Sequence, residues 1–186
     1  MAEREDDRSP RVRLRDVTLA DADLLDAWAA DPARQGGFND FGMPREPTPR
    51  EALEKGPLRN ERNGLLIVER VADSVPIGDV GWHRVTYGPN PESGAWNVGI
   101  DIIPDARGQG YGSEAQRLLA AWLYEHTDTH RIEASTDIEN VAEQRALEKA
   151  GFIREGIARG AQFRAGRHRD LVVFAKLRDD PPEGQS

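Results

Sequence analysis

The stretch from Pro104 to Ser113 constrains the fold more than any other part of the sequence. It carries glycines at three alternate positions, Gly108, Gly110 and Gly112. Glycine reaches positive φ readily and has no Cβ between its N–H group and a ligand. An apolar run over 98–103 precedes this stretch, and apolar residues at helical spacing follow it over 114–126. The pattern therefore predicts a strand, a glycine loop and a helix.

A glycine loop that opens onto a helix predicts a binding site for phosphate or pyrophosphate. The first N–H groups of a helix lack partners within the helix and lie at the positive end of its dipole. A mononucleotide P-loop would need Lys followed by Ser or Thr after its last glycine, whereas Ser113 and Glu114 follow Gly112 here. The alternative without a ligand is a glycine-rich turn that caps the helix through Ser113.

A dinucleotide-binding fingerprint is another alternative for the same loop. Gly108, Gly110 and Ser113 have nearly its spacing, and Glu133 follows about twenty residues later. That fingerprint belongs to a doubly wound sheet, in which strands and helices alternate. Here the two segments before 95–103 are themselves predicted strands. An oxidoreductase of this kind would bind NADH and have no affinity for coenzyme A.

Length and composition predict one domain that acts in the cytoplasm. The chain has 186 residues, of which 38% are hydrophobic, and this suits a single core. We expect a flexible arm over 1–10, a domain over 11–178 and a flexible tail over 179–186. The charged start resembles no signal peptide, and no apolar run approaches the roughly eighteen residues of a membrane span.

The net charge limits the kinds of partner that the sequence predicts, and the cysteine and histidine content limits the kinds of catalytic and metal site. A net charge of −8 argues against nucleic acid as a partner and favours a cationic one, such as an amine. The chain has no cysteine, which removes a cysteine nucleophile and cysteine-ligated zinc. Its four histidines are scattered without the spacing of metal ligands, so we expect no metal.

The periodicity along the chain predicts a mixed α/β sheet. The expected strands cover 12–15, 64–70, 77–87, 95–103, 130–136, 152–158 and 170–177, and the expected helices cover 18–31, 48–56, 114–126 and 140–150. The segment 33–49 is predicted to be a long loop. Because a strand–helix–strand crossover joins parallel neighbours, 130–136 should run parallel to 95–103. The expected fold has about seven strands, mostly antiparallel with one parallel pair, and about four helices.

Several motifs resemble the GNAT superfamily of acyl-CoA N-acyltransferases. The first is Arg107-x-x-Gly110-x-Gly112, which resembles the loop that holds the pyrophosphate of coenzyme A in that superfamily. The later motifs resemble its RimJ/RimL-like, ribosomal-protein N-acetyltransferase branch. They are Leu14-Arg15 with Ala20-Asp21-Ala22-Asp23, Asn140-Val141-Ala142, Leu147-Glu148-Lys149-Ala150-Gly151-Phe152, Arg154-Glu155-Gly156 and Arg169-Asp170-Leu171-Val172. The resemblance covers about residues 11–178.

This resemblance implies a site for acetyl-CoA as cosubstrate. The pantetheine arm would lie in a V-shaped opening between 95–103 and 130–136 and pair with the backbone as an added strand. The implied binding residues are Ile102, Ile103, Arg107, Gly108, Gln109, Gly110, Tyr111, Gly112, Ser113 and Asn140. An N–H group of Ile102 or Ile103 would polarise the thioester carbonyl. Asn140 would contact pantetheine and could also cap the helix that follows it.

The sequence departs from this branch at Glu143, where a Ser commonly follows the Asn by three residues. An ionised carboxylate cannot donate a proton, so the general acid is left open, and water could protonate the leaving thiolate. The attacking amine also needs a base. The candidates are Asp101 and Glu133, with His83 and Asp79 one strand further away. Each of these has an ordinary alternative role in a surface salt bridge.

The resulting prediction is an N-acetyltransferase that moves an acetyl group from acetyl-CoA to a primary amine in a ternary complex. The acceptor would be a protein N-terminus or a small amine, bound by the segments 33–47 and 159–168, which are both expected to be loops. The alternative is a GNAT-like module that binds acyl-CoA without catalysis, and Glu143 favours it. The acyl chain and the oligomeric state, including a homodimer, are left open.

Overall fold

A seven-stranded sheet forms the centre of the protein. The computed structural model describes residues 9–43 and 46–181, so most of the predicted arm and tail lies outside the described residues. The sheet order is β1-β2-β3-β4-β5-β7-β6. The strands are β1 (Val12–Asp16), β2 (Asn63–Arg70), β3 (Val75–Thr86), β4 (Gly94–Ile102), β5 (Arg131–Asp137), β6 (Ile153–Arg164) and β7 (Arg167–Leu177). Only β4 and β5 are parallel neighbours, which confirms the predicted mixed sheet.

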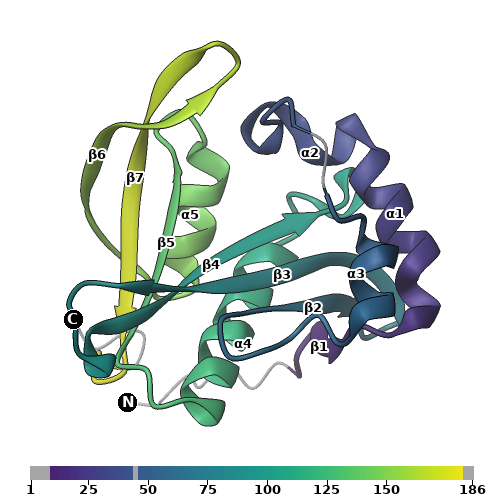
Figure 1. Ribbon diagram of the computed structural model, residues 1–186, viewed down its shortest axis with the longest axis horizontal. Helices are drawn as coiled ribbons and strands as arrows, with labels where there is room; N and C mark the ends of the chain where they lie inside the picture. The colour runs from purple at the N-terminus through teal and green to yellow at the C-terminus, as the bar shows by residue number, and fades with distance from the viewer. Residues whose placement is uncertain (1–8, 44–45, 182–186) are drawn as a thin grey trace, which may run out of the picture.

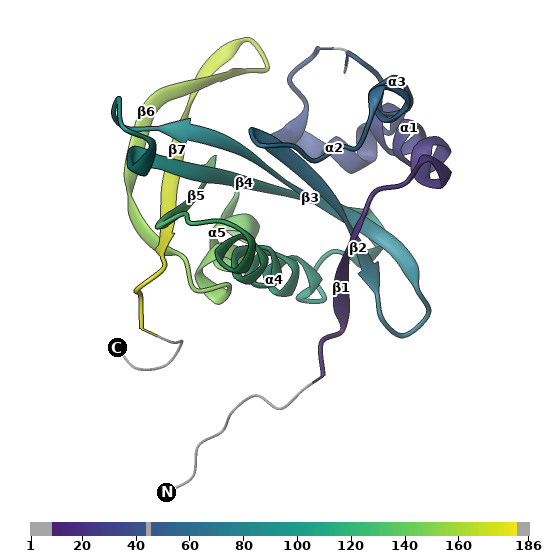
Figure 2. The same ribbon diagram turned by 60° about the horizontal axis from the view of Figure 1, so that its bottom comes forward.

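Five α-helices in the described chain cover the two faces of the sheet. They are α1 (Ala22–Ala30), α2 (Pro32–Asn39), α3 (Pro49–Lys55), α4 (Tyr111–His126) and α5 (Val141–Lys149). Figure 2 shows α4 and α5 on one face, with α1, α2 and α3 on the other face beside β1 to β4. None of the described helices is both long enough and apolar enough to cross a lipid bilayer.

Alternate side chains of β2 belong to two separate hydrophobic cores, one on each face of the sheet. Leu66 and Val68 belong to the larger core, which contains residues of α4 such as Leu119. Ile67, between them, packs with Leu25 of α1 in the smaller core. Successive side chains of a strand point to opposite faces, so a strand covered on both sides must be apolar throughout. This explains the continuous run of apolar residues in β2.

Part of the segment expected to be a loop over 33–49 is instead the helix α2. The side chain of Asp31 accepts a hydrogen bond of 2.9 Å from the N–H of Ala33, and Pro32 occupies the first turn. This Asp–Pro start is a strong helix signal. The glycines that follow suggest a loop, and Gly36 does interrupt the helix with a φ of +57°. The result is two short helical turns joined at Gly36.

The segment 159–168, expected to be a loop, is instead the end of a hairpin. β6 continues to Arg164 and β7 begins at Arg167. Between them, Ala165 and Gly166 have φ values of +50° and +78°, which suit a tight two-residue turn. Figure 1 shows this hairpin in yellow, rising beside α2. Two chain segments that are far apart in sequence therefore flank one end of the sheet.

The sheet opens between its two parallel strands. β4 and β5 pair only at Ala95↔Arg131, Trp96↔Ile132 and Asn97↔Glu133. Beyond Asn97 the two strands separate, as Figure 1 shows. β4 meanwhile remains paired with β3 as far as Ile102. The V-shaped opening that the sequence resemblance implied is present between these strands.

Candidate functional site

A cavity of about 650 Å³ lies where β4 and β5 separate. Its walls come from 98–102 on β4, the glycine loop, 134–136 on β5, the first turns of α5, and 35–39 on α2. Of the predicted site residues, Asp101, Ile102, Arg107, Gly108, Gly110, Gly112, Ser113 and Asn140 line it. Ile103, Gln109, Tyr111 and Glu133 are not among its lining residues.

The glycine loop has the backbone conformation that its sequence predicts. Gly108 and Gly110 have φ values of +72° and +82°, a region that residues with a Cβ rarely adopt. Gly110 is the N-cap of α4, and the hydroxyl of Ser113 donates a 3.0 Å hydrogen bond to its carbonyl. The first N–H groups of a sixteen-residue helix therefore begin at the wall of the cavity. This is a suitable site for an anionic group.

Arg11, just before β1, braces the outer side of this loop. Its guanidinium donates to the carbonyl of Gln109 at 3.0 Å and pairs with Glu114 at 3.0 Å. It also lies 5.2 Å from the centre of the Tyr111 ring. Gln109 and Tyr111, which were predicted to bind the cosubstrate, thus contact Arg11 and are absent from the cavity wall.

The backbone of β4 offers hydrogen-bonding groups to the cavity. The N–H of Ile103 donates to the carbonyl of Ile77 at 2.9 Å, so it points toward β3. Ile103 is therefore not available as the predicted oxyanion donor. N–H groups alternate in direction along a strand, which places those of Ile100 and Ile102 on the side facing away from β3. On that side β5 has already separated from β4, since their pairing stops at Asn97.

Asp101 lies in the cavity wall within a network of ion pairs. It is directly opposite Asp79 on β3, and the buried Arg34 of α2 lies between the two carboxylates. Arg34 pairs with Asp79 and lies 3.6 Å from Asp101. Its guanidinium also stacks 4.5 Å from the ring of Trp28. Arg34 of α2 thus offsets the repulsion between the two aspartate carboxylates.

Arg107 connects the glycine loop to α2. Its guanidinium donates to the carbonyl of Ile102 at 2.7 Å and also to the carbonyl of Arg34. A further contact of 3.5 Å reaches Asp101. Arg107 was predicted to hold the cosubstrate, and it does line the cavity, but its hydrogen bonds join two walls of the site.

Glu133 lies at the closed end of the V, where β4 and β5 still pair. Its carboxylate accepts hydrogen bonds from the hydroxyl of Tyr87, from Asn97 at 3.3 Å and from Arg131 at 3.1 Å. It does not line the cavity. The geometry therefore argues against Glu133 as the predicted base, because its carboxylate lies at the closed end of the V and outside the cavity lining.

The first turn of α5 brings a polar cluster to the cavity. The side chain of Asn140 caps the helix by accepting from the N–H of Glu143 at 3.3 Å, and it donates to Thr136 at 3.0 Å. Gln116 of α4 donates to the carboxyl of Glu143 at 3.0 Å. Burial raises the pKa of Glu143 to about 7, although the Gln116 hydrogen bond opposes this shift.

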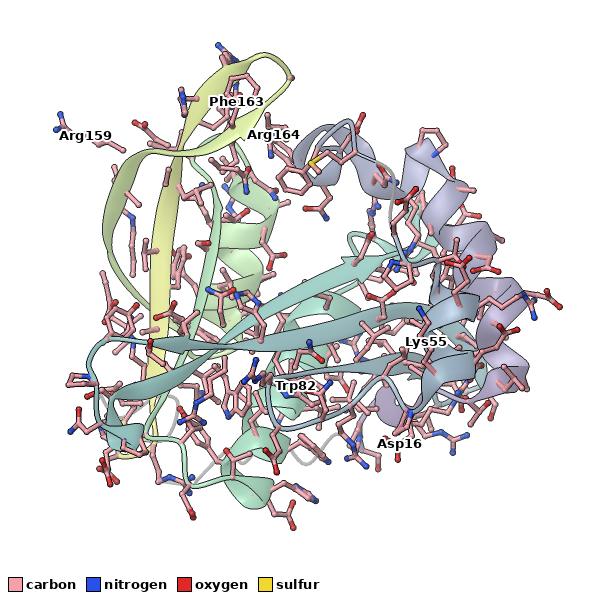
Figure 3. The ribbon with its side chains drawn as sticks, in the orientation of Figure 1. Asp16, Lys55, Trp82, Arg159, Phe163 and Arg164 are labelled. Atoms are coloured by element: carbon pink, nitrogen blue, oxygen red, sulfur yellow. The ribbon has the colours of Figure 1, made fainter. Side chains whose placement is uncertain are left out.

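Arg164, at the end of β6, links the hairpin to α2. It pairs with the fully buried carboxylate of Asp137 and donates to the carbonyl of Phe38 on α2. Figure 3 shows its side chain between the hairpin and α2. Burial opposes the ionisation of Asp137, but hydrogen bonds from Arg169 and the charge of Arg164 outweigh it and hold its pKa below the usual range.

Arg34 and Gln116 contact residues of the cavity wall, and the sequence prediction missed both. Arg34 follows Asp31-Pro32, and treating that pair as a helix start would have placed it on an ordered element. Gln116 stands within the apolar face of α4 next to Ala115, and a polar residue there indicates a buried partner. The contacts of Arg164 with Phe38 and Asp137 could not be predicted from a local pattern, because these partners are distant in sequence.

The sequence model of the acetyltransferase (GNAT) domain matches residues 11–153 of this chain. The chain belongs to the GNAT acetyltransferase family. The predicted resemblance is therefore confirmed, and the V-shaped cavity is part of a GNAT domain. The predicted enzyme class, an acetyltransferase, is confirmed with it.

Known N-acetyltransferases are similar to this GNAT chain in sequence. It is 27% identical to an uncharacterized N-acetyltransferase, p20, of Bacillus licheniformis over 173 residues, which cover 90% of this chain and 93% of that protein. It is 41% identical to the probable N-acetyltransferase YjcK of Bacillus subtilis over 83 residues, 45% of this chain and 46% of that protein.

Solved structures share the GNAT fold. Mycobacterium smegmatis RimJ, in complex with CoA-disulfide, matches with a TM-score of 0.77 and 24% identity over 95% of this chain and 87% of that chain. Spermidine N-acetyltransferase from Vibrio cholerae, in complex with CoA and spermine, matches with a TM-score of 0.75 and 19% identity over 91% and 96%. Both likenesses establish the fold.

Proposed function

We propose that this GNAT enzyme transfers an acetyl group from acetyl-CoA to the α-amine at the N-terminus of a peptide or protein. The amine would attack the thioester directly while both substrates are bound. The observation that carries the proposal is the unpaired side of β4, which faces the cavity next to the glycine loop. The extended pantetheine arm of acetyl-CoA and its anionic pyrophosphate would both find hydrogen-bond donors in this cavity.

The residues of the cavity suit acetyl-CoA in three respects. The N–H groups of Gly108 to Gly112, at the start of α4, suit the pyrophosphate. The N–H groups of Ile100 and Ile102 suit the amides of the pantetheine arm, which would pair with β4 as an added strand. The N–H of Ile102 is also the group that we assign to the thioester carbonyl. Asn140 lines the opposite wall and is assigned to the arm.

The charges around the cavity support an α-amine rather than a polyamine as the acceptor. Asp101, Asp79 and Asp137 are each paired with one or two arginines. A polyamine carries several positive charges and would gain little from carboxylates that are already neutralised. An α-amine has an ordinary pKa of about 8, against about 10 for an alkylamine, so it loses its proton more easily. RimJ and the spermidine enzyme share this fold equally, so the fold alone does not choose.

Asp101 is the residue that we assign as the base, directly or through one water molecule. It lines the cavity on β4 next to Ile102, and about a fifth of its side chain is exposed (19%). Arg34 and Arg107 lie 3.6 and 3.5 Å from its two oxygens and hold the carboxylate in the cavity wall. Of the two candidate bases Asp101 and Glu133, Asp101 is the one that lines the cavity.

The first experiment is a calorimetric titration with acetyl-CoA, with NADH and ATP as controls. We expect micromolar binding of acetyl-CoA alone. A panel of acceptors would then be incubated with labelled acetyl-CoA and examined by mass spectrometry: short peptides with free or blocked N-termini, spermidine, and a lysine analogue. Acetylation of the free N-termini is expected. Binding without turnover on any amine would instead favour the module that binds acyl-CoA without catalysis.

A further inference from the structure

Two glycines of the cavity wall stand where their surroundings would accept a side chain. They are Gly99 on β4 and Gly37 on α2. Neither has a φ in the positive range that favours glycine, whereas Gly36 and Gly108 do. Within the described part of the chain, a Cβ on either residue would meet no packed neighbour within 4 Å. Neither backbone conformation nor packing therefore accounts for glycine at these two positions.

Glycine is an unfavourable residue at both places. It loses more conformational freedom on folding than any other residue, so it weakens the interior of a helix or a strand. Glycine inside a strand usually marks a bulge, a bend, or the close approach of a ligand or another backbone. β3 and β4 pair in an unbroken register from Gly78↔Ile102 to Thr86↔Gly94, which includes Gly99. No backbone among the described residues approaches this position either. The remaining explanation is a ligand.

Gly99 lies on the face of β4 that carries the proposed base. Side chains alternate along a strand, so Gly99 and Asp101 share one face. Asp101 lies 3.6 Å from Arg34, which identifies this face as the one toward α2. Val98 and Ile102, on the other face of β4, pack in the larger core. Gly99 thus leaves an open space next to the carboxylate that would take the proton of the acceptor amine.

The elements around Gly99 leave this space wide. Gly81 of β3 is directly opposite Gly99, so this row of the sheet carries no side chain on either strand. Ser135 of β5, across the opening between the strands, is exposed and lines the same cavity. Gly36 and Gly37 are the part of α2 that contributes backbone alone to the cavity wall. Small residues from three sides therefore surround one region of the cavity.

The charged groups next to this region are already paired with one another. Asp101 lies 3.6 Å from Arg34 and 3.5 Å from Arg107, and Arg34 also pairs with Asp79. A charged side chain brought here would lose its hydration and would find its counter-charges already neutralised. An uncharged side chain would displace water without this loss. The region therefore favours an uncharged occupant.

We propose that this region receives the side chain of the acceptor's first residue, and that the enzyme selects acceptors whose first residue is large and uncharged, such as leucine, methionine or phenylalanine. This inference rests on the proposed function, because it concerns the residue whose α-amine is acetylated. That amine has to reach Asp101, directly or through one water molecule. The α-carbon is one bond from the amine, so its side chain must lie close to Asp101, and on β4 the neighbouring position of the same face is Gly99.

The first test measures kcat/KM for peptides that differ only in their first residue. We expect leucine, methionine and phenylalanine to exceed glycine, alanine and serine by about tenfold or more, because the larger side chains fill the space that the glycines leave. Glutamate and arginine in the first position should be no better than alanine. Equal values for alanine and leucine, or a preference for alanine, would overturn the inference.

The second test fills the proposed space from two walls, with Gly99→Val and Gly37→Leu. Valine suits a strand and leucine suits a helix. Each change should lower kcat/KM for the leucine peptide by about tenfold to a hundredfold and leave the alanine peptide within about threefold of wild type. The matched control is Gly156→Val on β6. Gly156 also lacks a positive φ and has open surroundings, but it does not line the cavity, so the wild-type preference should remain.

Calorimetry separates binding of the first side chain from the chemistry. Wild-type protein saturated with coenzyme A should bind the leucine peptide about tenfold more tightly than the alanine peptide, and Gly99→Val should bind the two equally. Acetyl-CoA alone should bind wild type and all three variants with similar affinity, which also shows that the variants are folded. Weaker acetyl-CoA binding by Gly99→Val would assign the glycine to the cosubstrate and overturn the inference.

The outcomes distinguish this inference from the proposed function. If wild-type protein binds acetyl-CoA and acetylates no peptide, the proposed function fails, and the inference fails with it. If it acetylates peptides and Gly99→Val slows the leucine and alanine peptides equally, only the assignment of the first side chain fails. Reversal of the preference in Gly99→Val and Gly37→Leu, with the preference retained in Gly156→Val, supports both.

Discussion

Arg164 at the end of β6 donates a hydrogen bond to the backbone carbonyl of Phe38 on α2, and so joins the hairpin to a wall of the cavity. The same guanidinium lies 5.4 Å from the ring of Phe38 and pairs with the buried Asp137. The hairpin and α2 are more than a hundred residues apart in sequence, as this contact spans 126 positions. The two segments that the sequence assigns to the acceptor, 33–47 and 159–168, are therefore connected to each other.

Replacing Arg164 with Met should break the connection between the hairpin and α2. We expect the KM for the acceptor to rise while the KM for acetyl-CoA changes little, because Arg164 joins the two segments, 33–47 and 159–168, that the sequence assigns to the acceptor. Asp137 would keep Arg169 as its partner, so the loss of stability should be about 1 to 3 kcal/mol. Steady-state kinetics and urea unfolding measure the two effects. Arg167→Met, an exposed change in the same hairpin, is the control, and equal acceptor KM values for both variants would contradict the prediction.

Replacing Gly110 with Ala should weaken acetyl-CoA binding. The new side chain would be forced to a φ of +82° and would meet Arg11 at 3.0 Å. Strain of this kind costs about 1 to 3 kcal/mol, and its relief would move the N–H groups at the start of α4. Gly166→Ala introduces similar strain at a φ of +78° in the hairpin turn, away from the loop. Calorimetry should show weaker binding for the first variant alone; equal affinities would remove the loop from the binding site.

Replacing Asp101 with Asn should lower kcat/KM for the acceptor by about tenfold to a hundredfold if Asp101 is the base. The effect should be largest at low pH, where the amine depends most on help in losing its proton. Coenzyme A affinity, measured by calorimetry, should be retained. The matched change is Glu133→Asn at the closed end of the V, which should leave the pH dependence of turnover unchanged. A loss that is the same at every pH would assign Asp101 a structural role.

Replacing Asp21 with Asn should remove a source of stability that depends on pH. Arg15 hydrogen-bonds both oxygens of Asp21, at 2.9 and 2.8 Å, and this lowers its pKa to about 2. A lowered folded-state pKa stabilises the protein above the unfolded value, and this contribution disappears as the pH falls toward 2. The variant should lose about 1 to 2 kcal/mol near pH 7 and much less near pH 2. Urea unfolding at both pH values measures the difference, and an equal loss at the two would argue against the ion pair.

The strands, the crossover and the glycine loop could be predicted because each depends on local pattern. Three alternating glycines after an apolar strand, with positive φ at Gly108 and Gly110, are such a pattern. The parallel pairing of β4 and β5 followed from the connection between them. Periodicity also predicted the general course of β2 and β3, because apolar residues there repeat over short distances.

The partners of individual charged residues could not be predicted from the sequence. Glu133 was a candidate base because it lies on a strand beside the predicted cleft, but Tyr87 and Asn97 engage it at the closed end of the sheet. The state of Glu143 depends on Gln116, which comes from another helix. Side-chain pairing across the fold sets these properties, and a local pattern contains no record of it.

The short pairing between β4 and β5 has a consequence for how the enzyme ends its cycle. A pantetheine arm laid along Ile100 and Ile102 would make the same backbone hydrogen bonds before and after the acetyl group has left. Such contacts hold substrate and product equally, so they raise affinity without accelerating the reaction. Coenzyme A should accordingly compete with acetyl-CoA at similar concentrations, and the rate of product departure should limit turnover once the acceptor is abundant.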